Sequence, residues 1–508
     1  MRRLMAAIAG LGVLLGAGPA SAFCGFYVSG AGTDLYNNAT MVVMMRDGTR
    51  TVLSMQNNYD GPPEDFAMVV PVPVVLGEED VKTLPDAIFA RVDQLAAPRL
   101  VEYWEQDPCA PEVYPGQMVM AAGAMPDMAE AEETGGDLGV TVEAEFVVGE
   151  YDIAILSAND SSGLDTWLRR EGYRVPEGAE PVLRPYVAQG TKFFVARVDV
   201  ERVTRVDGRA VLSPLRFHYD SETFSLPVRL GLLNSRGQQD LIVHVLARGQ
   251  RYEVANYDNV MIPTNLVVSH GVRGEFGPFY ASLLDRTLER HRGAVVTEYA
   301  WDASSCDPCP TPGLTPDEIT TLGADVVAAD PYGFTLTRLH YRYGRDDLGE
   351  DLVFRAAPPI VGGRGMPDAE GQLTEQGAQP SGSNAFQGRY VMLNPWQGEV
   401  ACDDPRPGRW GGPPSGGEPP PIAATNTAFV DRSGSLGSYL TQDLPELGVE
   451  AGASDSDDGS GPRTSAGPDA PRGGGCASCS VGAGSLSFGG GALVALLGLA
   501  LLWRRRSR

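Results

Sequence analysis

Cysteine is the residue type whose spacing in this chain most directly suggests chemistry. The 508 residues include seven cysteines: Cys24, Cys109, Cys306, Cys309, Cys402, Cys476 and Cys479. Cys306-Asp307-Pro308-Cys309 has the spacing of a thiol–disulfide redox motif, in which the first cysteine follows a strand and begins a helix, so that the helix dipole lowers its pKa. Here several prolines follow in a loop. We therefore interpret Cys306 and Cys309 as a structural disulfide, with a thiol–disulfide oxidoreductase as the alternative.

The remaining disulfide candidates are Cys24 and Cys109. Most cysteines pair in an oxidising compartment, and five of the seven precede the C-terminal Cys476 and Cys479. An odd number leaves one thiol free or paired outside this region. We predict a bond between Cys24 and Cys109, which leaves Cys402 unassigned.

Histidine offers little evidence for catalysis or metal binding. The five histidines are His218, His244, His270, His291 and His340. None belongs to a HExxH motif or another closely spaced metal-binding pair, so we expect no metal site and no cofactor. His218 and His340 fall on the polar faces of strands, the latter beside Arg338 and Arg342. His244 falls in an apolar run and His291 near a helix end. We expect all five to be solvated or structural, with a hydrolase site around Asp60 and His340 as the alternative.

One polar loop could bind a ligand through oxygen atoms. It contains Asn57, Asn58, Asp60, Glu64 and Asp65 and precedes an apolar strand. Such a set of oxygen ligands beside an aromatic residue would suit a cation or a glycan, although a tight turn explains the same residues. The chain has no G-x-S-x-G elbow, phosphate-binding P-loop or dinucleotide-binding glycine motif.

The elements that would position these residues are mostly strands. Apolar runs over residues 41–45 and 51–55 flank the turn dipeptide Asp47-Gly48, which predicts a hairpin. The run 66–76 predicts a buried strand that leaves its sheet at Pro71, because proline cannot donate to a ladder. Further strands are expected over the ranges 140–156, 192–203, 215–219, 224–233, 241–247 and 334–343. Alternation over 192–203 predicts a strand buried on one face only.

Three helices are well marked. A helix with one apolar face is expected over residues 85–96, with Thr83 as its candidate N-cap. Ser161-Ser162 caps a short helix that stops at Gly172, and Pro278 begins a helix that ends near residue 292. Strands interrupted by helices without regular βαβ alternation indicate an α+β fold with mainly antiparallel sheets and three or four packed helices. This globular region spans residues 23–360, as one domain or two.

The globular region resembles an uncharacterised bacterial family known as domain of unknown function 2330. The resemblance rests on the segments 23–28, 66–73, 151–156, 163–168, 337–343 and 351–354. Because no activity is assigned to this family, the resemblance implies no catalytic residue.

The N-terminal residues predict export. Arg2-Arg3, an apolar stretch and Ala20-Ser21-Ala22 are typical of a secretory signal peptide, which we expect to cover residues 1–22. The formal net charge of −25 disfavours nucleic acid as a partner, because such a field repels phosphate.

The C-terminal residues predict an anchor. Residues 361–475 are expected to be partly ordered and then to form a disordered stalk rich in Pro, Gly, Ser and Asp. Residues 476–508 contain Cys476 and Cys479, an apolar run over 486–503 long enough to span a bilayer as a helix, and a terminal arginine cluster that should stay cytoplasmic.

This C-terminal pattern resembles the myxobacterial C-terminal sorting signal (MYXO-CTERM), with Cys479 matching the defining cysteine. The resemblance implies processing near Cys479 by a dedicated sorting protease and retention at the cell surface. Together the two ends predict an exported protein of the cell envelope, held at the membrane by its C-terminal helix. We expect a non-enzymatic binding or structural role with an unknown ligand, and an envelope enzyme is the alternative.

Overall fold

The computed structural model describes most of the chain between residues 26 and 452. The described ranges are 26–28, 39–56, 67–110, 136–137, 140–173, 175–206, 209–234, 237–328, 330–345, 348–414, 421–425, 432 and 434–452. They belong to one compact unit, residues 1–457. Cys24, the polar loop of residues 57–65 and the whole of 476–508 lie outside the described residues. Among the described helices, none is long and apolar enough to cross a membrane.

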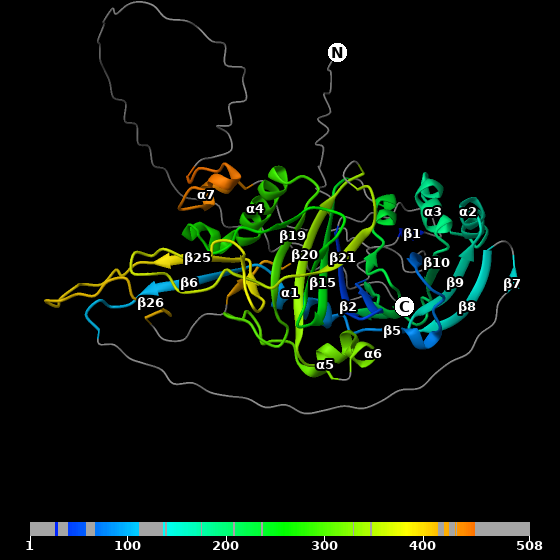
Figure 1. Cartoon of the computed structure of the whole chain (residues 1–508), viewed down its shortest axis with the longest axis horizontal. Coiled ribbons are helices and arrows are strands. Elements are labelled where there is room, and N and C mark those ends of the chain that lie inside the picture. Colours follow the sequence, from blue (N-terminus) through cyan, green and yellow to red (C-terminus); the bar gives the residue numbers. More distant parts are fainter. Residues whose placement is uncertain are drawn as a thin grey trace, which may run out of the picture. The chain divides into compact units, whose positions relative to one another are not determined.

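A large sheet forms the centre of the fold (Figure 1). Its strand order is β23-β22-β24-β19-β20-β15-β2-β3-β13-β5, with β17 paired to β19. The strands are β2 (Ala39–Asp47), β3 (Arg50–Met55), β5 (Val81–Thr83), β13 (Leu215–Asp220), β15 (Gln239–Arg248), β17 (Asn259–Met261), β19 (Val295–Asp302), β20 (Phe334–Tyr343), β22 (Ile360–Gly362), β23 (Gln379–Pro380) and β24 (Ala385–Gln387). Most neighbours are antiparallel, and the parallel pairs are β15 with β2, β17 with β19 and β22 with β24.

A second sheet is antiparallel throughout, in the order β1-β4-β10-β9-β8-β7. Its strands are β1 (Phe26–Val28), β4 (Ala67–Val72), β7 (Gly136–Asp137), β8 (Val140–Val148), β9 (Tyr151–Ala158) and β10 (Lys192–Val198). Three smaller groups complete the strands: β11 (Thr204–Val206) with β12 (Arg209–Val211), β14 (Ser225–Leu226) with β21 (Leu352–Ala357) and β16 (Arg251–Val254), and β18 (Leu266–Val267) with β25 (Arg389–Asn394), β6 (Arg99–Glu105), β26 (Trp410–Gly411) and β27 (Ile422–Ala423).

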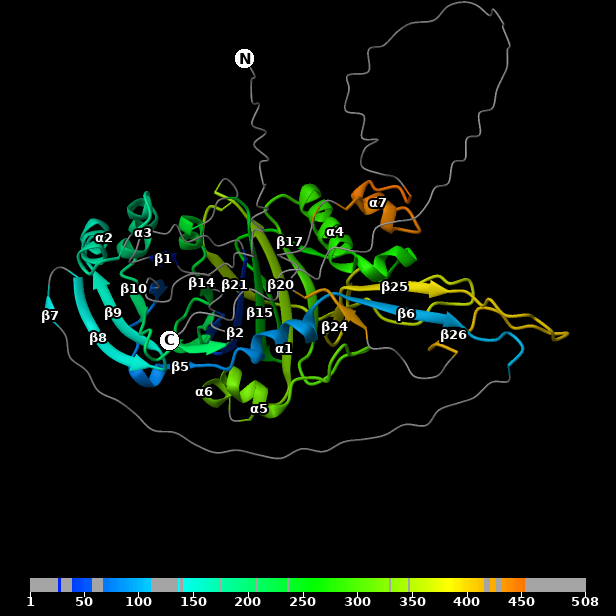
Figure 2. The same cartoon turned by 180° about the vertical axis from the view of Figure 1, so that it is seen from behind.

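The two large sheets pack face to face, and helices cover their outer faces (Figures 1 and 2). The core between the sheets contains Val42 and Val243 from the central sheet and Val70 and Phe194 from the second. Because side chains alternate along a strand, the opposite face of the central sheet packs against other elements, among them the helices α1 (Ala87–Ala96) and α5 (Pro316–Ile319). The opposite face of the second sheet packs against α2 (Ser161–Arg170) and α3 (Ala179–Ala188).

The helices are α1 (Ala87–Ala96), α2 (Ser161–Arg170), α3 (Ala179–Ala188), α4 (Phe276–Arg290), α5 (Pro316–Ile319), α6 (Asp325–Val327) and α7 (Leu436–Tyr439). The predicted α+β class is confirmed at this level, since sheet dominates and helices are few. The helices α1, α2 and α4 match the three sequence predictions. The helix starts differ from the predictions. Helix α1 begins after Asp86 rather than Thr83, α2 begins at Ser161 with Asp160 as its N-cap, and α4 begins at Phe276, two residues before Pro278. Helix α3, which contains Pro185, escaped prediction.

Three strand predictions need correction. The strand predicted over 224–233 is only the two-residue strand β14, and a 3-10 helix follows it over Arg229–Asn234. Pro71 lies inside β4 and pairs with Phe193, so the strand does not leave the sheet there. Proline is tolerated because the neighbour on the other side, β1, reaches only as far as Val69 among the described residues. Strand β10 is buried on both faces, since Phe193 packs against the helix layer while Phe194 packs against the central sheet.

The folded region also extends further than residue 360. Strand β25 pairs in parallel with β6 over six residues, and the described residues of 434–452 pack against α4 through five buried apolar side chains. These are Leu436, Tyr439, Leu440, Leu444 and Leu447. The apolar patch near residue 440 that interrupts a Gly/Pro/Ser-rich sequence therefore marks structure.

Two disulfides lie within the described residues. Cys306 bonds Cys309, as the sequence analysis expected. Cys109 bonds Cys402 across a sequence separation of 293 residues, so the predicted Cys24–Cys109 bond is wrong. The sequence alone did not indicate that Cys109 and Cys402 lie close together. The ladders of β6 with β25 and β26 bring the segments after residues 105 and 394 together.

We predict that the two disulfides contribute very differently to stability. Closing a long loop removes more entropy from the unfolded chain, so in the loop-entropy model loss of the Cys109–Cys402 bond should cost at most about 5 kcal/mol and loss of the Cys306–Cys309 bond about 2 kcal/mol. Urea unfolding of the Cys109→Ala/Cys402→Ala and Cys306→Ala/Cys309→Ala double variants would measure this. Equal losses would contradict the prediction.

Candidate functional site

The candidate site is built on one face of β20. Arg338, His340 and Arg342 alternate along this strand and therefore point to the same face, whereas Leu339 and Tyr341 point into the core between the sheets. The sequence predicted this polar face and left open whether His340 on it is solvated or structural. In the structure Arg338 and His340 have no exposed surface, because α1 and α4 cover the face.

Arg338 binds two carboxylates from different elements. Its Nη1 donates to Asp93 of α1, and its Nε donates to Glu298 of β19 at 2.5 Å. The Nη1 atom also lies 3.3 Å from Nε2 of His244. Burial alone would lower the pKa of Arg338, but the charges of Asp93 and Glu298 outweigh it and raise that pKa. The guanidinium thus joins α1 to the central sheet.

His340 lies between two carboxylates. Its Nδ1 is 2.8 Å from Glu298 and its Nε2 is 2.9 Å from Asp240 of β15. Burial alone would lower the pKa of His340, but Glu298 and Asp240 outweigh it and raise the pKa to about 9. The hydroxyl of Tyr280 donates to Glu298. Both ring nitrogens of His340 therefore act as donors in the imidazolium form.

Arg342 and Arg432 extend this arrangement toward the surface. Both donate to Asp285 of α4, and Nη2 of Arg432 also donates to the two oxygens of Asp240 at 3.3 and 3.2 Å. Residue 432 thus closes the outer end of the arrangement, although it lies some ninety residues beyond β20 in sequence.

We call these eight side chains the ionic row. They are Asp93, Asp240, Asp285, Glu298, Arg338, His340, Arg342 and Arg432. Four carboxylates face three guanidiniums and one imidazole, so the row is neutral only when His340 is protonated. Burial alone would raise the pKa of Glu298, but His340 and Arg338 lower it to about 2. A buried charge is tolerated when it is paired and hydrogen-bonded in this way.

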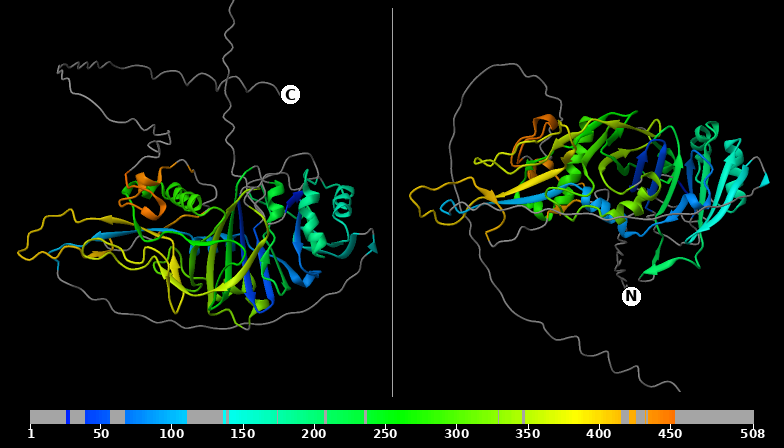
Figure 3. Two further views of the ribbon diagram at one scale, coloured as in Figure 1. Left: turned by 45° about the horizontal axis from the view of Figure 1, so that its top comes forward. Right: turned by 60° about the horizontal axis from the view of Figure 1, so that its bottom comes forward.

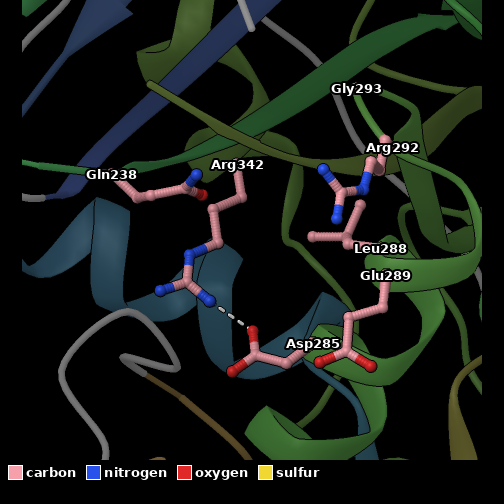
Figure 4. Close-up of a pocket in the computed structure, with 7 residues that line it drawn as sticks. All are labelled: Gln238, Asp285, Leu288, Glu289, Arg292, Gly293 and Arg342. Atoms are coloured by element: carbon pink, nitrogen blue, oxygen red, sulfur yellow. Dashed lines mark hydrogen bonds and ion pairs between the residues drawn. The ribbon is translucent and has the colours of Figure 1, made fainter. Parts of the chain in front are cut away.

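A cleft of about 390 Å³ lies at the outer end of the row. It is lined by Gln238, Asp285, Leu288, Glu289, Arg292, Gly293 and Arg342. Figure 4 shows the Arg342–Asp285 pair at the cleft, together with Glu289 of α4 and with Arg292, which follows the end of that helix. Side chains of both signs therefore face one concavity, which suits a polar ligand carrying charge or several hydroxyls.

The inner part of the row is not arranged for catalysis. A general base needs access to a substrate proton and a pKa near the working pH. His340 has no exposed surface and both of its nitrogens are engaged. The alternative hydrolase site around Asp60 and His340 thus has no accessible histidine, and Asp60 lies outside the described residues.

The other histidines are explained by local contacts. His218 lies 3.2 Å from Asp80, His270 contacts Asn394, and His291 is exposed as the C-cap residue of α4. His244 is fully buried, as expected for a core residue. Within the described part of the chain, no group of three or more His, Cys, Asp or Glu side chains could hold a metal ion.

The loop of Cys306 and Cys309 is anchored by buried polar side chains. Arg99, which stacks over the ring of Tyr299, donates to the carbonyl of Pro308 at 2.8 Å. Gln387 donates to the carbonyl of Asp307 at 2.6 Å. Helix α5 begins only at Pro316, so neither cysteine stands at a helix N-terminus. These contacts favour the structural interpretation of the disulfide.

The comparisons identify the family. A family model described as an uncharacterized protein conserved in bacteria (DUF2330) matches residues 18–355. The chain belongs to this family. No curated protein and no solved structure matches it. The matched residues, which we call the DUF2330 region, contain every member of the ionic row except Arg432.

Sequence reasoning missed the acidic half of the row. Asp93 lies on the buried side of an otherwise apolar helix, and Glu298 lies in the run Val295-Val296-Thr297-Glu298-Tyr299-Ala300. An isolated carboxylate in an apolar element signals a buried partner, because an unpaired buried charge is too costly to tolerate. Arg432 gave no such signal, since an arginine between Asp431 and Ser433 in a Gly/Pro/Ser-rich part of the sequence is expected at the surface. The predicted ligand loop of residues 57–65, Cys24, Cys476 and Cys479 lie outside the described residues.

We predict that truncating Arg338 destabilises the DUF2330 region strongly. Removing one partner of a buried ion pair leaves uncompensated charges and typically costs 3–5 kcal/mol, so Arg338→Ala should lose about that much. Arg355, which pairs with Glu253 at the surface, provides the matched control, and Arg355→Ala should change stability by less than about 1 kcal/mol. Equal effects in urea unfolding would contradict the assignment.

We also predict that stability falls at alkaline pH because of His340. The pKa is raised from 6.5 to about 9, so the stabilisation is fully present below pH 6.5 and is lost as pH rises through about 9. The loss should be about 3 kcal/mol. Unfolding free energies at pH 6 and pH 9.5 would measure it. His340→Gln should lack this part of the pH dependence and His291→Gln should keep it; the same slope in all three proteins would exclude His340 as its source.

Proposed function

We propose that this DUF2330 protein is exported and anchored in the cell envelope, where its folded region serves as a non-enzymatic binding or structural module. The observation that carries the proposal is the disulfide between Cys109 and Cys402, supported by the second between Cys306 and Cys309. Stable structural disulfides are typical of oxidising compartments and rare in the cytosol. This agrees with the signal peptide expected over residues 1–22.

The C-terminal sequence supports attachment to the membrane. Residues 486–503 are apolar and precede an arginine cluster, and hydrocarbon accepts the first while the second stays on the cytoplasmic side. We propose that residues 476–508 act as a sorting signal of the MYXO-CTERM type, processed near Cys479 by a sorting protease.

The cleft between α4 and the end of β20 is the ligand-binding surface that we assign to this module. It presents the side chains of Glu289, Arg292 and Gln238 to solvent around the Arg342–Asp285 pair. The ionic row beneath it fixes these elements against each other, so the cleft is held in one shape, as a binding site requires. A polar envelope component is the class of ligand that these side chains favour.

We predict that intact cells expose the folded region to added protease. The full-length chain should fractionate with the envelope, and an immunoblot against the folded region should lose its signal when protease is added outside. A variant lacking residues 1–22 should stay in the cytosol and resist the protease. Recovery of the full-length chain in the soluble cytosol with residues 1–22 intact would overturn the proposal.

A further inference from the structure

Residues 434–452 follow the DUF2330 region in sequence and pack against its helix α4. In Figure 3 this segment, in orange, lies against the green helix α4 in the left panel. The ring of Tyr439 packs edge-on against Phe279 of α4, with 5.8 Å between ring centroids, and its hydroxyl donates to Glu275. Arg286 and Arg290 donate to the carbonyl of Leu447. We call this segment the α7 segment.

Arg432 lies just before the α7 segment and reaches into the ionic row. Its guanidinium spans Asp240 of β15 and Asp285 of α4. The side chain of Asp240 is only 5% exposed, whereas those of Arg432 and Asp285 are 18% and 26% exposed, so this contact is partly buried. Arg342 bridges the same two carboxylates from the opposite side, with its Nη1 on Asp285 and its Nε 3.8 Å from Asp240.

The charge balance shows what the site requires. Without Arg432 the four carboxylates of the row face only two guanidiniums and the protonated His340, which leaves one negative charge uncompensated. Asp240 would keep His340 as its partner and Asp285 would keep Arg342. The vacated position would therefore be a preformed, partly buried anionic site whose two carboxylates are set at the spacing of a guanidinium fork. Arginine suits such a site better than lysine, because its planar group donates to two carboxylates at once.

We propose that Asp240 and Asp285 form a guanidinium-binding site of the DUF2330 region, and that this chain fills the site with its own Arg432. The occupant comes from outside the matched residues 18–355, whereas both carboxylates lie inside them. The α7 segment adds the apolar contacts that hold this occupant in place. The ligand class of the site is an arginine side chain followed by an apolar segment.

Chemical rescue of Arg432→Ala tests this proposal with the full-length chain in a mild non-ionic detergent. The variant should melt at a lower temperature than the wild type, because the row then carries one negative charge that no cation compensates. Methylguanidinium at ten times its dissociation constant should then raise the melting temperature by about 1–2 °C. Methylammonium at the same concentration should give a smaller rise. The wild type and Arg355→Ala, whose pair lies at the surface, should not respond to methylguanidinium.

A second variant separates charge from shape. Arg432→Lys keeps the positive charge without the fork, so its melting temperature should fall between those of Arg432→Ala and the wild type. It also decides the question if Arg432→Ala does not fold. A melting temperature of Arg432→Lys equal to that of the wild type, or equal rescue of Arg432→Ala by methylguanidinium and methylammonium, would show a site for any cation and overturn the proposal. An unchanged melting temperature in Arg432→Ala would overturn the site altogether.

Discussion

Glu298 carries its charge with no exposed surface, and this constraint determines how the surrounding elements must meet. A carboxylate in the interior is stable only when its lost hydration is replaced by donors at hydrogen-bond distance. Arg338, His340 and Tyr280 supply them from β20 and α4. The two charged donors need further partners, which Asp93 of α1 provides for Arg338 and Asp240 of β15 provides for His340. Each charged residue that binds Glu298 therefore needs a partner of opposite charge, and this series of ion pairs ends at the surface.

This series of ion pairs links the central sheet, the cleft and the α7 segment. The outermost carboxylate, Asp285, is shared by Arg342, which lines the cleft, and by Arg432, which precedes the α7 segment. Loss of Arg432 from Asp285 would alter both the charge of the cleft wall and the charge balance around Asp240. The cleft and the α7 segment are thus connected through one carboxylate, with no need for a movement of the sheet.

The sequence predicted the elements better than their surroundings. Periodicity located β20 and identified Arg338, His340 and Arg342 as one face, because alternation is a local property of the strand. What covers that face depends on α1 and α4, which are distant in sequence, and single-sequence patterns carry no such information. The same limit explains the Cys109–Cys402 pairing. The missed helix α3 has a different cause, since Pro185 inside it opposed a helical interpretation that packing against the second sheet overrides.

The position of His340 also bears on which kind of function this fold can support. A catalytic histidine exchanges its proton at the working pH, which requires a pKa near neutrality and a path to substrate. His340 has neither, because its pKa is about 9 and its ring is enclosed. It therefore behaves as a fixed cation that completes the neutrality of the row at any pH below about 8. The accessible groups nearest to the row are those that line the cleft, and these side chains carry charge and hydrogen-bonding groups. This agrees with the binding role proposed above, in which the ionic row supports the cleft.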